Sequence, residues 1–457
     1  MAKAKAKAKT KAKPTTPLKL VLGKTKDAFE ISLEGKQVTS KLGTTWSMGK
    51  PKEQSYATPE KAKLAYDKLV AAKREAGFRE VGEIDAPTIP IARDEALEAA
   101  IREDRADPAA YLVYADWLQT QGSPVGEMIV FAHKKQQQRA NAIAKKLGLP
   151  QPEMATMGWR LGLWQWLRLE NNLNWMDGSW DPMPLARALF GSPLCAVLEE
   201  LRIGILRWDF NDQPDVIAEA GRHGWAKDLA RLHLGDVDDN IDMAHHTIGD
   251  VGKLITKHFP NLTSLKLHSG EQSWRGGKES FGIGGLELPR LKDLTIETCA
   301  MSSKRMKAVL GAKLPALERL ELWFGGRDNE ATARIADVVP VLDGTLFPRV
   351  RHLGLRNCEL VTDLVRLLPS RKLAKQLEVL DLSMGTMSDE DAGELAEAAA
   401  KFPALKTLNV DDSWLTSAGL RTLKAAFKGK QVVSKDQREP YDDDEDEAAN
   451  RYASVTE

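Results

Sequence analysis

The chain has 457 residues, with 65 lysines and arginines against 65 aspartates and glutamates, so its formal net charge at pH 7 is zero. This length allows more than one folded core. The sequence contains no run of about eighteen apolar residues, which is the length that a membrane-spanning helix needs. The three cysteines, Cys195, Cys299 and Cys358, offer neither a disulfide framework nor a zinc pattern. We therefore expect a soluble protein of the reducing cytoplasm without membrane contact.

The two ends of the chain carry opposite charge. Residues 1–16 alternate lysine with alanine, whereas residues 442–447 are all acidic. Dense charge of one sign favours disorder, so we predict solvated tails at 1–16 and 434–457. The basic tail has a second interpretation as a nonspecific anchor for nucleic acid, in which its lysines neutralise phosphates. These lysines are Lys3, Lys5, Lys7, Lys9, Lys11 and Lys13.

Residues 17–81 are predicted to form a small α+β domain. Two runs, LKLVL from Leu18 and FEISLEGKQVTSKLG from Phe29, are typical of strands, with a hairpin turn at residues 34–36. A helix is predicted from Pro59 to about residue 76 with Thr58 as its N-cap. Its predicted apolar face comprises Ala62, Leu64, Ala65, Leu69 and Ala72.

This order of parts, ending in TPEKAKLAYDKLVAAKREAGFREV, resembles the WGR domain of poly(ADP-ribose) polymerases and of bacterial proteins. The family resemblance implies contact with nucleic acid or with neighbouring domains. Where the family has Trp-Gly-Arg, this sequence has Leu42-Gly43-Thr44, and Trp46 stands two positions on. Two roles stay open for this domain: nucleic-acid binding, with Trp46 as the aromatic residue, or packing and protein contact.

A linker and a helical domain are expected next. Residues 82–92 are rich in proline and lack periodicity, which is typical of a linker. In residues 93–137 a first helix presents Leu97 and Ile101, and a second begins at Asp107 and carries Tyr111 and Tyr114 as core residues. The stretch LVYADWLQTQG resembles a short companion domain found beside leucine-rich repeats or WGR-like modules in myxobacterial and planctomycete proteins. The resemblance implies architecture and no catalytic role.

Residues 138–194 concentrate aromatic side chains. We predict that this region caps a repeat array, because large aromatic residues cover an exposed end of an apolar core efficiently. A partly exposed aromatic patch that binds a partner is the alternative. The tryptophans concerned are Trp159, Trp164, Trp166, Trp175 and Trp180.

Residues 195–433 repeat the phrase LxxLxL at intervals of roughly 30 residues. The last two apolar positions of the phrase alternate with polar ones, which is typical of a strand with one buried face, and the segments between phrases favour helices. One repeat buries too little apolar surface to stand alone, so neighbours must stack. The phrases begin at Leu198, Leu229, Leu262, Leu291, Leu317, Val350, Leu377 and Leu405, with a degenerate copy at Trp164.

This pattern resembles the ribonuclease-inhibitor-like class of leucine-rich repeats. It implies an α/β fold: a leucine-rich-repeat solenoid curved into a horseshoe with strands on the concave side, preceded by the small α+β WGR-like domain and the short helical domain. Phe-Pro pairs such as Phe259-Pro260 precede several phrases and are expected to end the preceding helix. Cys299 and Cys358 each follow a phrase by three residues, where we expect them to satisfy turn backbone.

In such a horseshoe the residues that flank the strand leucines form columns on the concave face. The N-terminal half of these columns leans basic, and the C-terminal half adds acidic residues, including Glu297, Glu321 and Asp381. An extended bipolar surface suits a protein partner, although charges that serve only solubility are the alternative. The predicted partner-binding residues are Arg168, Arg202, Arg231, His233, Lys266, His268, Trp323 and Arg356.

Enzymatic interpretations find little support in the sequence. No nucleophile, base and orienting acid can be assembled from its motifs, and we predict no cofactor and no metal. The expected function is a non-enzymatic scaffold that binds an unidentified protein partner on the concave face. The alternative is a nucleic-acid-associated protein that uses the Lys/Ala tail and the WGR-like domain. Accessory control of an enzyme encoded elsewhere is a third interpretation.

Overall fold

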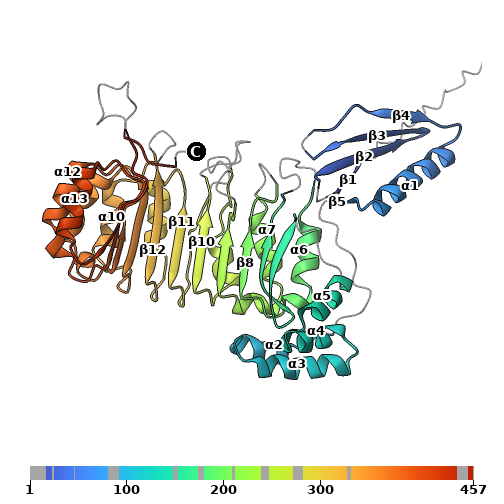
Figure 1. Ribbon diagram of the computed structural model, residues 1–457, viewed down its shortest axis with the longest axis horizontal. Coiled ribbons are helices and arrows are strands. Elements are labelled where there is room, and N and C mark those ends of the chain that lie inside the picture. The colour runs from blue at the N-terminus through green and yellow to red at the C-terminus, as the bar shows by residue number, and fades with distance from the viewer. Residues whose placement is uncertain are drawn as a thin grey trace, which may run out of the picture.

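The protein combines a small antiparallel sheet with a large, mainly parallel one (Figure 1). A computed structural model describes residues 17–22, 25–45, 47–80, 92–147, 153–172, 180–207, 211–237, 246–270, 281–326, 331–439 and 451–455. The Lys/Ala tail, Trp46, residues 82–91 of the predicted linker and the acidic run at 442–447 lie outside these described residues.

The small sheet has the strand order β4-β3-β2-β1-β5. Its strands are β1 (Leu18–Leu22), β2 (Asp27–Glu34), β3 (Gln37–Thr44), β4 (Lys52–Ser55) and β5 (Arg79–Glu80), and helix α1 spans Pro59–Glu75. The predicted hairpin is confirmed, since Glu34 pairs with Gln37 across a turn in which Gly35 has a φ of +58°. The predicted helix start is confirmed as well, because the Thr58 side chain accepts a hydrogen bond from the Lys61 amide.

The apolar face predicted for α1 is confirmed at Ala62 and was wrong at both of its leucines. Leu64 is 71% exposed and Leu69 is 38% exposed, whereas Ala62 is fully buried with Tyr66 and Val70 packed beside it. These three residues lie four apart and therefore share one side of the helix. The sequence count omitted Tyr66, although the apolar body of a tyrosine can cover a core while its hydroxyl reaches water.

Four helices follow: α2 (Glu95–Glu103), α3 (Pro108–Thr120), α4 (Pro124–His133) and α5 (Gln137–Lys146). Asp107 caps α3 by accepting from the Ala109 amide, which confirms the predicted helix start, and Gly122 adopts a φ of +70° just beyond the end of the helix. Tyr111 and Tyr114 are buried, which confirms them as core residues.

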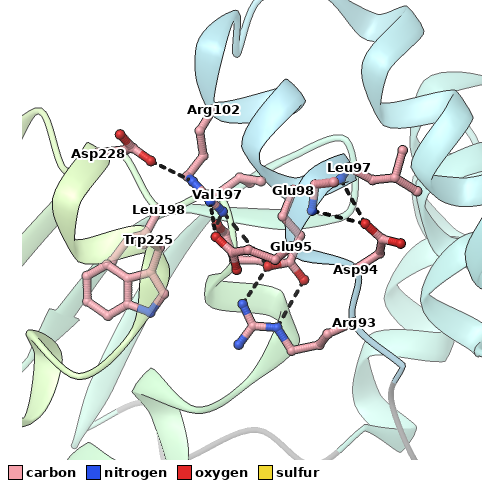
Figure 2. A network of polar contacts seen from close by, with 12 residues as sticks. Arg93, Asp94, Glu95, Leu97, Glu98, Arg102, Val197, Leu198, Trp225 and Asp228 are labelled. Carbon is pink, nitrogen blue, oxygen red and sulfur yellow. Dashed lines mark hydrogen bonds and ion pairs between the residues drawn. The ribbon is translucent and has the colours of Figure 1, made fainter.

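A polar network fixes this helical unit to the segments before two strands of the large sheet, β8 (Glu200–Ile203) and β9 (Arg231–Leu234) (Figure 2). The side chain of Arg102 on α2 is only 4% exposed. Its Nε lies 2.8 Å from Asp228 Oδ2, and its Nη1 donates to the Ala196 carbonyl at 2.9 Å. Arg105 donates to the carbonyls of Leu198 and Asp228. Two arginines therefore satisfy backbone carbonyls of the segments before β8 and β9 and join the helical unit to the large sheet.

The large sheet has eleven strands in the order β16 to β6. Neighbouring strands from β7 to β16 are parallel, and β6 pairs antiparallel with β7. All eight phrases and the degenerate copy form strands. The phrases and the copy are the nine strands from β7 to β15, and β6 and β16 flank them. The eleven strands are β6 (Ala155–Arg160), β7 (Leu163–Leu169), β8 (Glu200–Ile203), β9 (Arg231–Leu234), β10 (Ser264–His268), β11 (Asp293–Glu297), β12 (Arg319–Gly325), β13 (His352–Cys358), β14 (Val379–Asp381), β15 (Thr407–Asn409) and β16 (Gln431–Val433).

Helices lie between most of these strands, although the described residues place none between β6 and β7 or between β10 and β11. The buried residues of the helices share one apolar cluster with the strand leucines. The helices therefore cover the leucine face of the sheet. They are α6 (Met183–Phe190), α7 (Gln213–Ala220), α8 (Gly252–His258), α9 (Ser303–Leu310), α10 (Ile335–Leu342), α11 (Val361–Leu367), α12 (Asp389–Glu397) and α13 (Ser417–Ala426). Helix α8 ends at His258, immediately before Phe259-Pro260, as the sequence predicted.

The buried cysteines behave as structural residues. Cys358 Sγ accepts the Leu360 amide at 3.3 Å, which confirms its predicted role at the turn. Burial raises the pKa of Cys195 well above its ordinary range and that of Cys358 to about 12, so both thiols stay protonated at neutral pH. Within the described parts of the chain, no helix is both long and apolar enough to cross a membrane.

The prediction that residues 434–457 form one disordered tail was wrong for two of its parts. Residues 434–439 and 451–455 lie against the sheet, and Ala453 is fully buried. The Asn357 side-chain amide pairs with the backbone of Val455. The composition argument averaged the acidic run over the whole segment, whereas the residues beyond that run include Tyr452, Ala453 and Val455, whose apolar groups can pack.

Candidate partner-binding face

The face of the large sheet opposite the helices presents the predicted columns. Strand register aligns the first column from Trp166 on β7 to Thr407 on β15, and the second from Arg168 to Asn409. In the third column, His268 pairs with Glu297 and Trp323 with Arg356. The alignment follows from the spacing of the buried leucines, because side chains alternate between the two faces of a strand.

At the N-terminal end of this face Arg168 lies between two carboxylates. Its Nε is 2.8 Å from Asp236 Oδ2, and its Nη1 contacts Glu170. His233 Nδ1 is 3.3 Å from Asp236 Oδ1. Burial lowers the pKa of His233 to about 4, against the opposing attraction of Asp236. His233 is therefore neutral at pH 7, and Arg168 is the cation of this group.

The next group joins β8 and β9 through Glu200. Arg231 places Nε 2.8 Å from Glu200 Oε2 and Nη1 2.7 Å from Glu199 Oε1. Arg202 pairs with the other oxygen of Glu200, and its guanidinium lies 5.6 Å from the centroid of the Trp166 ring. Each predicted arginine thus has a carboxylate partner on this face.

Glu297 organises the middle of the face. Its Oε1 lies 2.8 Å from Lys266 Nζ, and its Oε2 lies 2.9 Å from His268 Nδ1. The His268 ring stacks on the His246 ring with centroids 5.4 Å apart. Burial alone would raise the pKa of Glu297, but its contacts with His268 and Lys266 lower that pKa overall, so the carboxylate stays ionised.

The C-terminal group centres on Glu321. Trp323 Nε1 and Arg356 Nη1 each donate to Glu321 Oε1 at 3.0 Å. Arg356 Nε also donates to Ser383 Oγ at 2.9 Å, and its guanidinium carbon lies 4.9 Å from the centroid of the Trp323 ring. Burial raises the pKa of Glu321, but Trp323, Arg356 and Arg319 together bring it below its ordinary value. Stacking and hydrogen bonds from two of its nitrogens therefore fix Arg356.

The charges of this face are layered rather than bipolar. The side chains of Arg202, Arg231 and Lys266 are 40–41% exposed, whereas those of Glu297 and Glu321 are 8% and 3% exposed. The carboxylates of the predicted acidic C-terminal half are thus less exposed to solvent than the cations of this face. Sequence reasoning chose the cations as binding residues and did not pair them with the carboxylates that orient them: Glu170, Glu199, Glu200, Asp236 and Glu297. The column alignment could have revealed Glu200 and Glu297, which lie on strands beside Arg231 and Lys266.

The described residues contain no group of three or more histidine, cysteine, aspartate or glutamate side chains arranged to hold a metal ion.

Comparison with known proteins adds the fold alone. No family model matches the sequence, and no curated protein matches it. The crystal structure of a protein from Bacteroides fragilis is similar over 97% of this chain and 100% of its own, with a TM-score of 0.50 and 17% sequence identity. This similarity supports the mixed α/β fold alone, and it says nothing about what the face binds.

Proposed function

We propose that the chain is a leucine-rich-repeat solenoid that acts as a non-enzymatic scaffold in the cytoplasm and binds a protein partner on the sheet face opposite its helices. In this proposal the WGR-like domain and the repeat-companion domain precede the solenoid, and the tryptophan-rich region caps it. The strand register supports the solenoid, because equivalent phrase positions such as Leu265 and Leu294 lie side by side.

The observation that carries the binding proposal is the stacked pair of Trp323 and Arg356. Tryptophan and arginine are the residues that most often dominate interface energies. Both are partly exposed here, and Glu321 and Ser383 already hold the guanidinium in place. A side chain ordered before binding loses less conformational entropy when the partner arrives.

The layered charges indicate what kind of partner surface fits. Outward-facing guanidinium and ammonium groups offer hydrogen-bond donors, while the carboxylates beneath them neutralise most of the net charge. This favours a protein surface rich in carbonyl and carboxylate acceptors over a phosphate backbone, whose binding relies on uncompensated cations. The nucleic-acid alternative rests on the Lys/Ala tail and Trp46, which lie outside the described residues.

Affinity capture tests this proposal. Wild-type protein, a Trp323→Ala/Arg356→Ala double variant and an Arg366→Ala control are exposed to lysate of the source organism with and without nuclease. Arg366 is also ion-paired, with Glu394, but belongs to helix α11. We expect one protein to survive nuclease with wild type and control and to be lost with the double variant. Equal capture by all three forms, or recovery only of nuclease-sensitive material, would contradict the proposal.

A further inference from the structure

Three successive repeats contain the same uncommon backbone conformation at or just beyond the carboxyl ends of their strands. Asn357, Met384 and Asp412 have φ angles of +49°, +65° and +49°, and each stands one residue after the third column. Residues other than glycine rarely adopt this left-handed region, and methionine is less common there than asparagine or aspartate. Such strain persists where surrounding structure enforces it, and it concentrates at binding sites.

All three left-handed residues contact residues 451–455. The Asn357 side chain donates from Nδ2 to the Val455 carbonyl at 2.7 Å and accepts the Val455 amide at Oδ1 at 2.8 Å. The Met384 carbonyl accepts the Ser454 amide at 2.9 Å. Asp412 accepts the Ser454 hydroxyl. Because of this repeated conformation, two side chains and one backbone carbonyl hydrogen-bond to the same extended segment, residues 451–455. This segment crosses the carboxyl ends of β13 to β15.

These contacts recognise mostly main chain, but the side chains of the segment also meet defined surroundings. Ala453 is fully buried, so a larger residue has no space there. The Tyr452 ring packs edge-on against Trp414 with centroids 5.4 Å apart. Val455 packs against the buried pair Cys299 and Ala300. The site thus favours a peptide that presents, in this order, an aromatic residue, a small residue, a residue with a hydroxyl group and a β-branched residue.

Arg438 completes the site from the other side of the segment. Its guanidinium lies 4.9 Å from the centroid of the Trp414 ring and 5.6 Å from that of Tyr452. It donates to the carbonyls of Tyr452, Gly385 and Asp412. Arg438 therefore holds the strand-end backbone and the passing peptide together.

We propose that the carboxyl ends of β13 to β15 form a binding site for an extended peptide and that residues 451–455 are its resident, displaceable ligand. The competing occupant is a partner-protein segment with the pattern aromatic–small–Ser/Thr–aliphatic. Displacement is feasible because Ala453 is the single fully buried side chain of the segment, and segments with few buried apolar contacts open at low cost. This proposal rests on Asn357, Met384 and Asp412 and does not require the Trp323–Arg356 face to bind anything.

Fluorescence anisotropy with a labelled peptide, RYASVTE, tests the site. It is titrated into wild type, a chain ending at residue 450, and a full-length Ala453→Arg variant whose own segment no longer fits. We expect saturable binding to both altered chains and at least about tenfold weaker binding to wild type, because a tethered ligand competes at high effective concentration. We expect Asn357→Leu, added to the Ala453→Arg chain, to weaken binding about tenfold. The control Asn261→Leu removes a half-buried asparagine that donates to the Lys227 carbonyl before β10, and it should leave binding unchanged.

Several outcomes would overturn the proposal. One is the absence of peptide binding to either altered chain while both melt cooperatively near the wild-type temperature. Others are equal binding to wild type and to the shortened chain, or equal binding of a scrambled peptide. Failure of both altered chains to fold would show that residues 451–455 are an indispensable part of the core and not a displaceable ligand.

Discussion

The guanidinium carbon of Arg356 lies 4.9 Å from the centroid of the Trp323 ring, and the two residues occupy paired positions on adjacent strands. Both donate to the same oxygen of Glu321, so one nearly buried carboxylate sets the orientation of the whole group.

Replacing Glu321 by Gln removes the charge that Arg356 and Arg319 share. We expect the free energy of unfolding at pH 7 to fall by about 1–2 kcal/mol in urea titrations. The pKa of Glu321 is lowered from 4.5 in the folded state, so its contribution is present above pH 4.5 and disappears as the pH falls through the lower folded value. Equal acid sensitivity of wild type and Glu321→Gln below pH 4.5 would contradict this assignment.

His233 is predicted to resist protonation. Burial lowers its pKa from 6.5 to about 4, so the unfolded chain binds this proton more readily than the folded one. The neutral His233 ring therefore makes its full contribution to the free energy of unfolding above pH 6.5. As the pH falls toward 4, the free energy of unfolding declines by at most about 3 kcal/mol. NMR titration should show the His233 ring unprotonated at pH 5.5. A midpoint near 6.5 would contradict the burial described here.

Arg102→Met is expected to loosen the helical unit α2–α5. Removing a nearly buried cation from Asp228, Glu95 and the Ala196 carbonyl should cost about 3 kcal/mol. Hydrogen exchange should accelerate in α2 and α3 and remain slow in β12. The control is Arg187→Met, whose side chain is 59% exposed and which should change stability by no more than about 0.5 kcal/mol. If the two substitutions had equal effects, the polar network around Arg102 would not be what joins the helical unit to the large sheet.

Replacement of two glycines by alanine should change the free energy of unfolding in opposite directions. A Cβ at Gly325 would overlap the Cys299 carbonyl oxygen, and the backbone there has a φ of +75°, so Gly325→Ala should cost more than about 3 kcal/mol. Gly393 lies inside helix α12, and a Cβ there would meet open space, so Gly393→Ala should gain about 0.5–1 kcal/mol. Urea unfolding measures both, and a tolerated Gly325→Ala would contradict the close approach of β12 to residue 299.

The sequence predicts the large sheet well because its leucines recur at positions that must be buried. Once Leu265 and Leu294 are aligned, their polar neighbours fall into columns without further information. The pairing of Lys266 with Glu297 was not predicted, because register fixes which residues are near but not where long side chains point. The Asn357–Val455 contact joins residues 98 apart in sequence, and no local pattern marks it.

The most direct test of the central proposal is the affinity of the captured partner for wild type and for single variants at the stacked pair. We predict that Trp323→Ala and Arg356→Ala each weaken binding by at least about 2 kcal/mol, roughly thirtyfold, while Arg366→Ala changes it by less than about threefold. Unchanged affinity in both Trp323→Ala and Arg356→Ala, with folding intact, would contradict the assignment of this face as the partner-binding surface.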